Sequence, residues 1–169
     1  MKLCDSCKNI SWYRAGMRAI ELGHSYCLSC VLSCGIKFDE EATELASQWG
    51  RLECLKLLSE YGCSWNKKTC ETAAETDNLE CLVYAHENGC PWDKRTCAMA
   101  AKGGSLRCLK YAHENGCPWD IRTLRNAVDE FAWECRDYAY EKGVRWPKLT
   151  LFQRNLGIGS KWLIIPTLL

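Results

Sequence analysis

Glycine and tryptophan recur along this chain at a fixed interval of 27 residues. Each tryptophan follows its glycine by three positions, in the pairs Gly62 and Trp65, Gly89 and Trp92, Gly116 and Trp119, and Gly143 and Trp146. A fixed period of this length is typical of stacked-repeat proteins, in which each unit buries its apolar face against its neighbours. The sequence therefore predicts a stack of similar units.

Composition and charge narrow the classes of function. The 169 residues are 47% apolar and 25% charged, which is ordinary globular usage. A net charge of +1 gives no global field to hold nucleic acid or a membrane surface. The N-terminal residues lack the apolar run of a signal peptide, and no stretch approaches the roughly 20 apolar residues of a membrane span. We expect a soluble protein in a reducing compartment, the cytoplasm.

The first half of one unit, residues 93–119, has the pattern of a short helix. Asp93 is the expected N-cap, because its carboxylate can accept a hydrogen bond from the first-turn amides. Cys97, Ala100 and Ala101 follow at i, i+3 and i+4, so one face is small and buried. The equivalent cap positions in other copies are Asp39, Asn66 and Asp120.

The second half predicts another helix and a turn. Gly103 and Gly104 end the first helix, and Ser105 is expected to cap the second. Gly116 then closes the second helix in the left-handed conformation that glycine adopts at low cost. We expect Trp119 to fall back across the junction between units and to be buried there. The inward face of the second helix is Leu106, Leu109 and Ala112.

This helix–turn–helix unit resembles the ankyrin repeat. The resemblance lies in Thr96-(x)3-Ala100-Ala101, Gly104, Leu106-Arg107-Cys108-Leu109 and Glu114-Asn115-Gly116. It implies an all-α solenoid of stacked ankyrin-like repeats. At 27 residues the unit is six short of the usual ankyrin length, which implies a lost or shortened β-hairpin finger. Such units are similar to the short ankyrin variant common in large DNA viruses of amoebae and in some protists.

The register extends in both directions from the central units. Gly35 and Phe38 match Gly62 and Trp65, so a degenerate first unit precedes the regular ones. The predicted organisation is an N-terminal cap at 1–11, five repeats at 12–38, 39–65, 66–92, 93–119 and 120–146, and a C-terminal cap and tail at 147–169.

The chain has 14 cysteines, and most of them follow the repeat register. Equivalent positions in adjacent units should lie about 8 to 10 Å apart, the spacing of packed helices. A disulfide needs Cα atoms within roughly 7 Å, so bridges between equivalent cysteines are excluded, whereas pairs at different repeat positions remain conceivable. We expect reduced cysteines that serve as small apolar side chains.

Four cysteines outside the register form the pattern of a metal site. Cys4 and Cys7 make a Cys-x-x-Cys knuckle, and Cys30 and Cys34 stand one helical turn apart. Together they could hold a structural zinc ion that fastens the N-terminal cap to the first unit. Two alternatives stay open: four reduced cysteines without metal, or a redox pair of Cys4 and Cys7, which lacks the usual strand and helix context. No cofactor is required by either alternative.

The three histidines give little support to catalysis. Gly23 and His24 fall where the ankyrin pattern often has a turn histidine. His86 and His113 share one repeat position, where other copies carry Ser59 and Tyr140, which predicts a partly buried, hydrogen-bonded site. No nucleophile, base and carboxylate can be assembled and no phosphate loop is present, so we expect a protein that is not an enzyme.

Partner recognition is expected on the positions that vary between copies. These lie on the first helix of each unit, which the resemblance places on the concave face. Lysines and arginines also recur at the helix starts and form a basic ridge, which either contacts an acidic partner segment or only keeps the surface soluble. The predicted partner-binding residues are Glu71, Thr72, Glu75, Lys94, Arg95, Met99, Lys102, Arg122, Arg125 and Asp129.

The resemblance implies a non-catalytic protein–protein interaction module, a scaffold or adaptor that binds a partner protein through its concave face. If the likeness to viral repeat proteins extends to the source, the partner is a host protein and the compartment is the host cytoplasm. The alternative is a nucleic-acid-binding protein that uses the basic ridge and a zinc-stabilised N-terminus. Balanced charge and the lack of an aromatic-basic surface run disfavour it.

Overall fold

The computed structural model describes residues 11–146, and that range is entirely helices and short connections. The helices are α1 (Trp12–Leu22), α2 (Ser25–Ser33), α3 (Glu40–Gln48), α4 (Leu52–Glu60), α5 (Lys67–Glu75), α6 (Leu79–Glu87), α7 (Lys94–Lys102), α8 (Leu106–Glu114), α9 (Ile121–Asp129) and α10 (Trp133–Glu141). Between residues 11 and 146 there is no strand, so the all-α prediction is confirmed.

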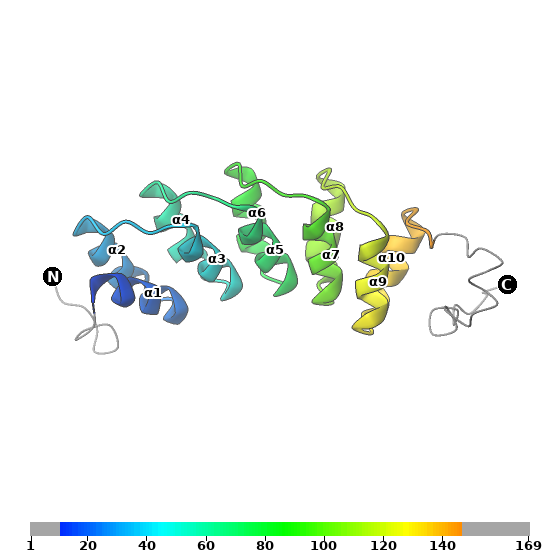
Figure 1. Cartoon of the computed structure of the whole chain (residues 1–169), viewed down its shortest axis with the longest axis horizontal. Helices are drawn as coiled ribbons and strands as arrows, with labels where there is room; N and C mark the ends of the chain where they lie inside the picture. The colour runs from blue at the N-terminus through cyan, green and yellow to red at the C-terminus, as the bar shows by residue number, and fades with distance from the viewer. Residues whose placement is uncertain (1–10, 147–169) are drawn as a thin grey trace.

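The helices form antiparallel pairs that stand in a single row, as Figure 1 shows. First helices pack against first helices (α1, α3, α5, α7 and α9), and second helices against second helices. The row bows into a shallow arch with the second helices along its outer side. Each pair lies inside one of the five predicted units; the predicted caps fall almost entirely outside the described residues and stay predictions.

The predicted N-caps of the first helices are confirmed. Asp93 accepts a hydrogen bond from the Arg95 amide at 2.8 Å, and Asp120 accepts one from the Arg122 amide at 2.9 Å. The other two caps are Asp39, which accepts from the Glu41 amide, and Asn66, which accepts from the Thr69 amide. These side chains satisfy amides that have no partner within their own helix, which fixes where each unit begins.

The expected cap of α8 is wrong in its chemistry. Ser105 stands at the N-cap position but makes no capping hydrogen bond; its hydroxyl donates to the Glu75 carbonyl of the preceding unit, at 3.4 Å. Arg51 and Asn78 occupy the same repeat position and do the same: Arg51 Nη2 donates to the Glu21 carbonyl at 3.1 Å and Asn78 Nδ2 to the Ser47 carbonyl at 2.9 Å. This column of side chains therefore satisfies the end of the preceding first helix.

The core is a continuous line of small and branched apolar side chains. Leu55, Leu82 and Leu109, one from each central second helix, are fully buried. Facing them are the small residues of the first helices, all with no exposed surface: Cys70, Ala73, Ala74, Cys97, Ala100 and Ala101. Small side chains let neighbouring first helices approach closely, so each unit buries its face on the next one.

The turn between the two helices of a unit needs a left-handed residue. Gly50 and Gly104 supply it with φ of 63° and 69°, but Asp77 and Phe131 stand at the same position with φ of 56° and 58°. A side chain is strained in this region, which makes the third and fifth units locally less favourable.

Candidate functional site

Histidine, tryptophan and tyrosine meet at the loop side of the central units. The His86 ring stacks on Trp92 with centroids 3.7 Å apart, and Tyr111 of the next unit meets both rings edge-on. His86 Nδ1 and the Tyr111 hydroxyl are 3.0 Å apart and share a hydrogen bond. The predicted partly buried, hydrogen-bonded histidine is therefore confirmed, and its partners are structural.

The same group recurs one unit later. His113 stacks on Trp119 at 3.9 Å, and its Nδ1 lies 2.9 Å from the Tyr138 hydroxyl. We call the two groups, His86–Trp92–Tyr111 and His113–Trp119–Tyr138, the aromatic triads. The expectation of fully buried tryptophans is wrong: Trp92 and Trp119 are half-buried, because the triad covers only part of each indole. They do pack against the core across the junction between units.

The first-helix face differs from the prediction at its centre. Glu71 was expected to face a partner, but only 8% of its surface is exposed. Its carboxylate lies 3.4 Å from Arg95 Nε on the next helix. Burial raises the pKa of Glu71, and the positive charge of Arg95 works against that rise. Glu71 and Arg95 are thus a contact between two units.

The other predicted residues of this face lie nearer to solvent. Thr72 and Met99 are half-buried, whereas Arg125 and Asp129 are exposed. Lys102 is also exposed and contacts Glu75 of the preceding unit, with Nζ and Oε1 2.7 Å apart. The face that a partner could reach therefore contains residues of α5, α7 and α9 in one row.

The basic ridge is paired with carboxylates along its length. Lys67 Nζ lies 2.9 Å from an oxygen of Asp93, and Lys94 Nζ lies 3.6 Å from an oxygen of Asp120. Arg122 Nη2 is 3.0 Å from the same Asp120 oxygen. Hydrogen bonds from Arg95 and Lys67 lower the pKa of Asp93, and hydrogen bonds from Arg122 lower that of Asp120.

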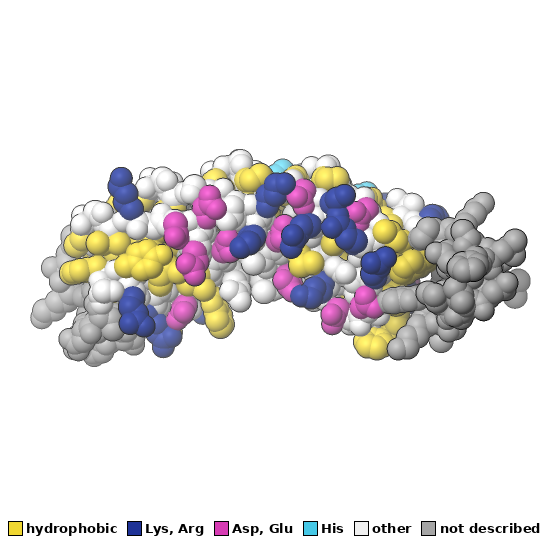
Figure 2. Space-filling model, in the orientation of Figure 1, with side chains coloured by type: hydrophobic (Ala, Val, Ile, Leu, Met, Phe, Trp, Pro, Cys, Tyr) yellow, Lys and Arg dark blue, Asp and Glu magenta, His cyan; other side chains and the backbone are white. Residues whose placement is uncertain are grey.

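This pairing explains why lysine recurs at helix starts, where the helix dipole disfavours it. Each lysine reaches the N-cap aspartate of the following unit, one residue short of a full repeat away. Figure 2 shows Lys and Arg side chains interspersed with Asp and Glu over the middle of the displayed face. The ridge therefore offers alternating charge to a partner.

The predicted metal ligands are only partly within the described residues. Cys30 is buried in α2 and Cys34 is exposed at its end, while Cys4 and Cys7 lie outside the described residues. Among residues 11–146 no group of three or more cysteine, histidine or carboxylate side chains is arranged to hold a metal ion. The zinc site therefore stays a prediction that zinc analysis of the dialysed full chain would test.

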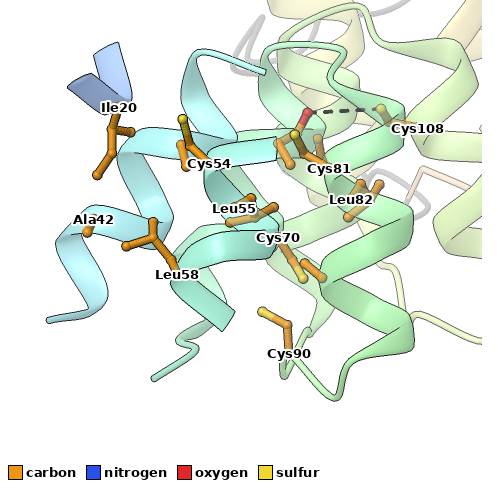
Figure 3. Packing of buried hydrophobic residues seen from close by; sticks show 14 of the residues in the cluster. Ile20, Ala42, Cys54, Leu55, Leu58, Cys70, Cys81, Leu82, Cys90 and Cys108 are labelled. Carbon is orange, nitrogen blue, oxygen red and sulfur yellow. Dashed lines mark hydrogen bonds between the residues drawn. The ribbon is translucent and has the colours of Figure 1, made fainter. Parts of the chain in front are cut away.

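The cysteines of the repeat register lie in the core, where Figure 3 shows several of them among the leucines. No disulfide links the cysteines of residues 11–146. Burial raises the pKa of Cys54, Cys81 and Cys135 to about 11 and that of Cys108 to about 12. Thiols held protonated in this way are poor nucleophiles and serve as packing groups.

Two features of the surface were missed. A groove of about 310 Å³ lies between the loops that follow α2 and α4, lined by Leu32, Ile36, Phe38, Tyr61 and Cys63 among others. Aromatic side chains are also exposed at the ends of first helices, Trp49 at 52% and Phe131 at 73%. Their signal in the sequence is a large aromatic where other copies have Thr76 and Gly103, or Gly50 and Gly104.

Comparison with solved structures gives the same architecture. The chain is similar to the human ASB11 ankyrin repeat domain, with a TM-score of 0.66, 16% sequence identity, and coverage of 77% of this chain and 69% of the other. The fold is that of an ankyrin-repeat solenoid. No protein-family model matches the sequence, and no curated protein matches it. Among residues 11–146 no helix has the length and apolar character to cross a bilayer.

Proposed function

We propose that this ankyrin-like solenoid is a non-catalytic interaction module that binds a partner protein through the solvent-facing residues of its first helices. The observation that carries the proposal is the division of labour within each unit. Residues that contact the next unit repeat from copy to copy, whereas Thr72, Met99 and Asn126, which share one position on the first-helix face, differ in size and chemistry. Variation confined to one face of a repeated framework is typical of recognition surfaces in repeat proteins.

The chemistry of the described side chains supports a binding role over a catalytic one. His86 and His113 are occupied by their tyrosine partners, and the core thiols are held protonated by burial. The ion pairs along the basic ridge also reduce the charge available to nucleic acid, which leaves that alternative without a specific observation in its favour. Protein partners bind surfaces of mixed polar and apolar character such as this one.

The test is a pair of matched double variants. The face variant, Met99→Ala with Arg125→Ala, removes side chains from α7 and α9 on the proposed surface. The control variant, Arg107→Ala with Lys110→Ala, removes exposed cations from the second helix α8. The partner is first captured with the wild-type chain and identified, and its affinity for each purified variant is then measured by calorimetry.

We expect the face variant to weaken binding by at least about tenfold, because a few central side chains dominate most interfaces. The control should bind like the wild-type chain. Equal affinity of the face variant and the wild type would contradict the proposed surface, and loss of binding in the control alone would move it to the second helices. Circular dichroism and thermal melts of both variants confirm that they remain folded.

A further inference from the structure

Two pairs of cysteines lie together within single units, at repeat positions 20 residues apart. In the third unit Cys70 of α5 faces Cys90, which lies in the loop after α6; Figure 3 shows the two side chains directed toward each other. In the fourth unit Cys97 and Cys117 stand at the same two positions. All four side chains are buried, with at most 4% of their surface exposed.

Each pair is joined by hydrogen bonds that order the two sulfurs. The Cys90 thiol donates to the Asn66 carbonyl, with the sulfur 3.2 Å from the oxygen, and the Cys117 thiol donates to the Asp93 carbonyl at the same distance. The side chains of Cys70 and Cys90 are also hydrogen-bonded to each other, as are those of Cys97 and Cys117. The loop sulfur of each pair is thus fixed against the helix sulfur.

We propose that Cys70 with Cys90, and Cys97 with Cys117, are disulfide-forming sites that close when the folded chain meets a peroxide. Sulfurs already in contact need to approach by only about 2 Å to reach the length of a disulfide bond. The bridge would tie the first helix of a unit to the loop that ends the same unit. Nothing in this inference depends on the identity of a partner.

The cysteine of the loop is the better first nucleophile. A hydrogen bond from Cys70 lowers the pKa of Cys90, and one from Cys97 lowers that of Cys117, whereas the helix cysteines have raised pKa values. Cys90 also lies next to the exposed Pro91, so a small opening of the loop would admit a peroxide. Cys70 lies deeper and is fully buried.

The reaction balances with one peroxide for each bridge. The Cys90 thiolate attacks one oxygen of hydrogen peroxide, the O–O bond breaks, and the departing hydroxide takes up a proton to leave as water. Cys90 is then a sulfenic acid. The Cys70 sulfur attacks the Cys90 sulfur, the S–O bond breaks, and a second water leaves with the Cys70 proton. Two thiols are oxidised to one disulfide, and the peroxide is reduced to two waters.

The chain supplies its own controls at the same two positions. The second unit has Thr43 opposite Cys63, and the fifth has Leu124 opposite Val144. Thr43 and Leu124 are fully buried, so Cys70→Thr and Cys97→Leu introduce side chains that this fold already accommodates there. Each variant removes one partner of a pair and leaves the other cysteine in place.

The experiment treats the folded, fully reduced full-length chain with hydrogen peroxide, blocks the remaining thiols, and maps linked peptides by mass spectrometry. We expect peptides that join Cys70 to Cys90 and Cys97 to Cys117, while Cys63 is recovered as a blocked thiol. The midpoint of thermal unfolding should rise by about 5 °C on oxidation, because each bridge closes a loop of some 20 residues. Added reductant should reverse the rise.

The double variant Cys70→Thr with Cys97→Leu should show neither linked peptide nor the rise in midpoint. Bridges that form only in denaturant, or folded chain in which Cys90 and Cys117 are oxidised without linkage to Cys70 and Cys97, would overturn the proposal. An equal rise in the double variant would also overturn it. Because the readout needs no partner, failure here leaves the proposed binding function to its own test.

Discussion

The central units and the N-terminal units have the same helices but different contacts at their junctions. In the third and fourth units, tryptophan is stacked on histidine and met by a tyrosine from the next unit, so each of the two following junctions contains an aromatic triad. In the second unit Ser59 replaces the histidine, and Trp65 contacts Tyr84 without a stacking partner. In the first unit Phe38 replaces tryptophan and stacks on Tyr13.

This difference teaches that one backbone tolerates several junction chemistries, provided that the small core residues are kept. Where the triads are complete, the apolar surface of the loops is shared between rings. Where they are incomplete, aromatic surface is left to solvent: Tyr61 is 50% and Trp49 is 52% exposed in the second unit. The N-terminal units therefore carry a stickier surface than the central ones.

The largest expected effect is at the junction between the third and fourth units. A Cβ at Gly103 would overlap the Glu75 carbonyl, and backbone cannot move as a side chain can. Gly103→Ala should lower the free energy of unfolding by about 3 kcal/mol in urea denaturation. Gly89→Ala is the control, since it adds only left-handed strain in open space and should cost about 1 kcal/mol. Equal costs would show that this junction is not tighter than others.

Removal of one tryptophan tests the triads directly. Trp92→Ala should destabilise by about 2 to 3 kcal/mol, because it removes stacking on His86 and the contact with Tyr111. Trp65→Ala should cost about 1 kcal/mol less, since Trp65 lacks the histidine. Thermal and urea unfolding of both variants measure the difference. A larger loss at Trp65 would mean that the triads contribute nothing beyond burial.

The carboxylates of Asp93 and Asp120 predict acid sensitivity in the central units. Their pKa values are lowered in the folded chain, so the stabilisation is complete above the unfolded value near 4 and is lost as the pH falls through the lower folded values. Asp93→Asn with Asp120→Asn keeps the caps, as Asn66 does, and should remove about 1 kcal/mol at pH 7. Unfolding measured from pH 7 to pH 2 should then fall less steeply than for the wild type. An unchanged slope would assign the acid loss elsewhere.

The smallest expected effect is a gain. Ser59→His would give the second unit the histidine that the third and fourth units have, and it would complete a third triad with Trp65 and Tyr84. Stability should rise by about 0.5 kcal/mol, the low end for a stacked pair. The melting curve checks it, with Ser59→Ala as the control for loss of the hydroxyl. A destabilised histidine variant would show that the spacing of this junction differs from the central ones.

The sequence predicted the architecture because glycine, tryptophan and cap residues act within one unit. Asp93, Gly116 and the buried Cys97 perform their predicted roles. The errors concern side chains that act between units. Glu71 is charged and variable, which resembles a binding residue, but Arg95 of the next helix covers it. Ser105 fits a cap signal, yet its hydroxyl reaches across the junction, and only the column with Arg51 and Asn78 hints at this.

The candidate site was less accessible to sequence reasoning for the same reason. The recurrence of lysine at helix starts was correctly noted as unusual for the helix dipole. Its cause, an aspartate 26 positions later, lies outside any window used to recognise a helix. The identity of a partner depends on a second molecule, whose surface no residue of this chain encodes.

The lysine-to-aspartate contacts have a consequence for the length of the chain. Lys67 meets Asp93 as Lys94 meets Asp120, so every unit presents the same donor to its successor and the same acceptor to its predecessor. Excision of residues 93–119 would join Trp92 to Asp120 and bring Lys67 to an equivalent carboxylate. Whole copies can thus be gained or lost by recombination between duplicated segments without the invention of a new junction.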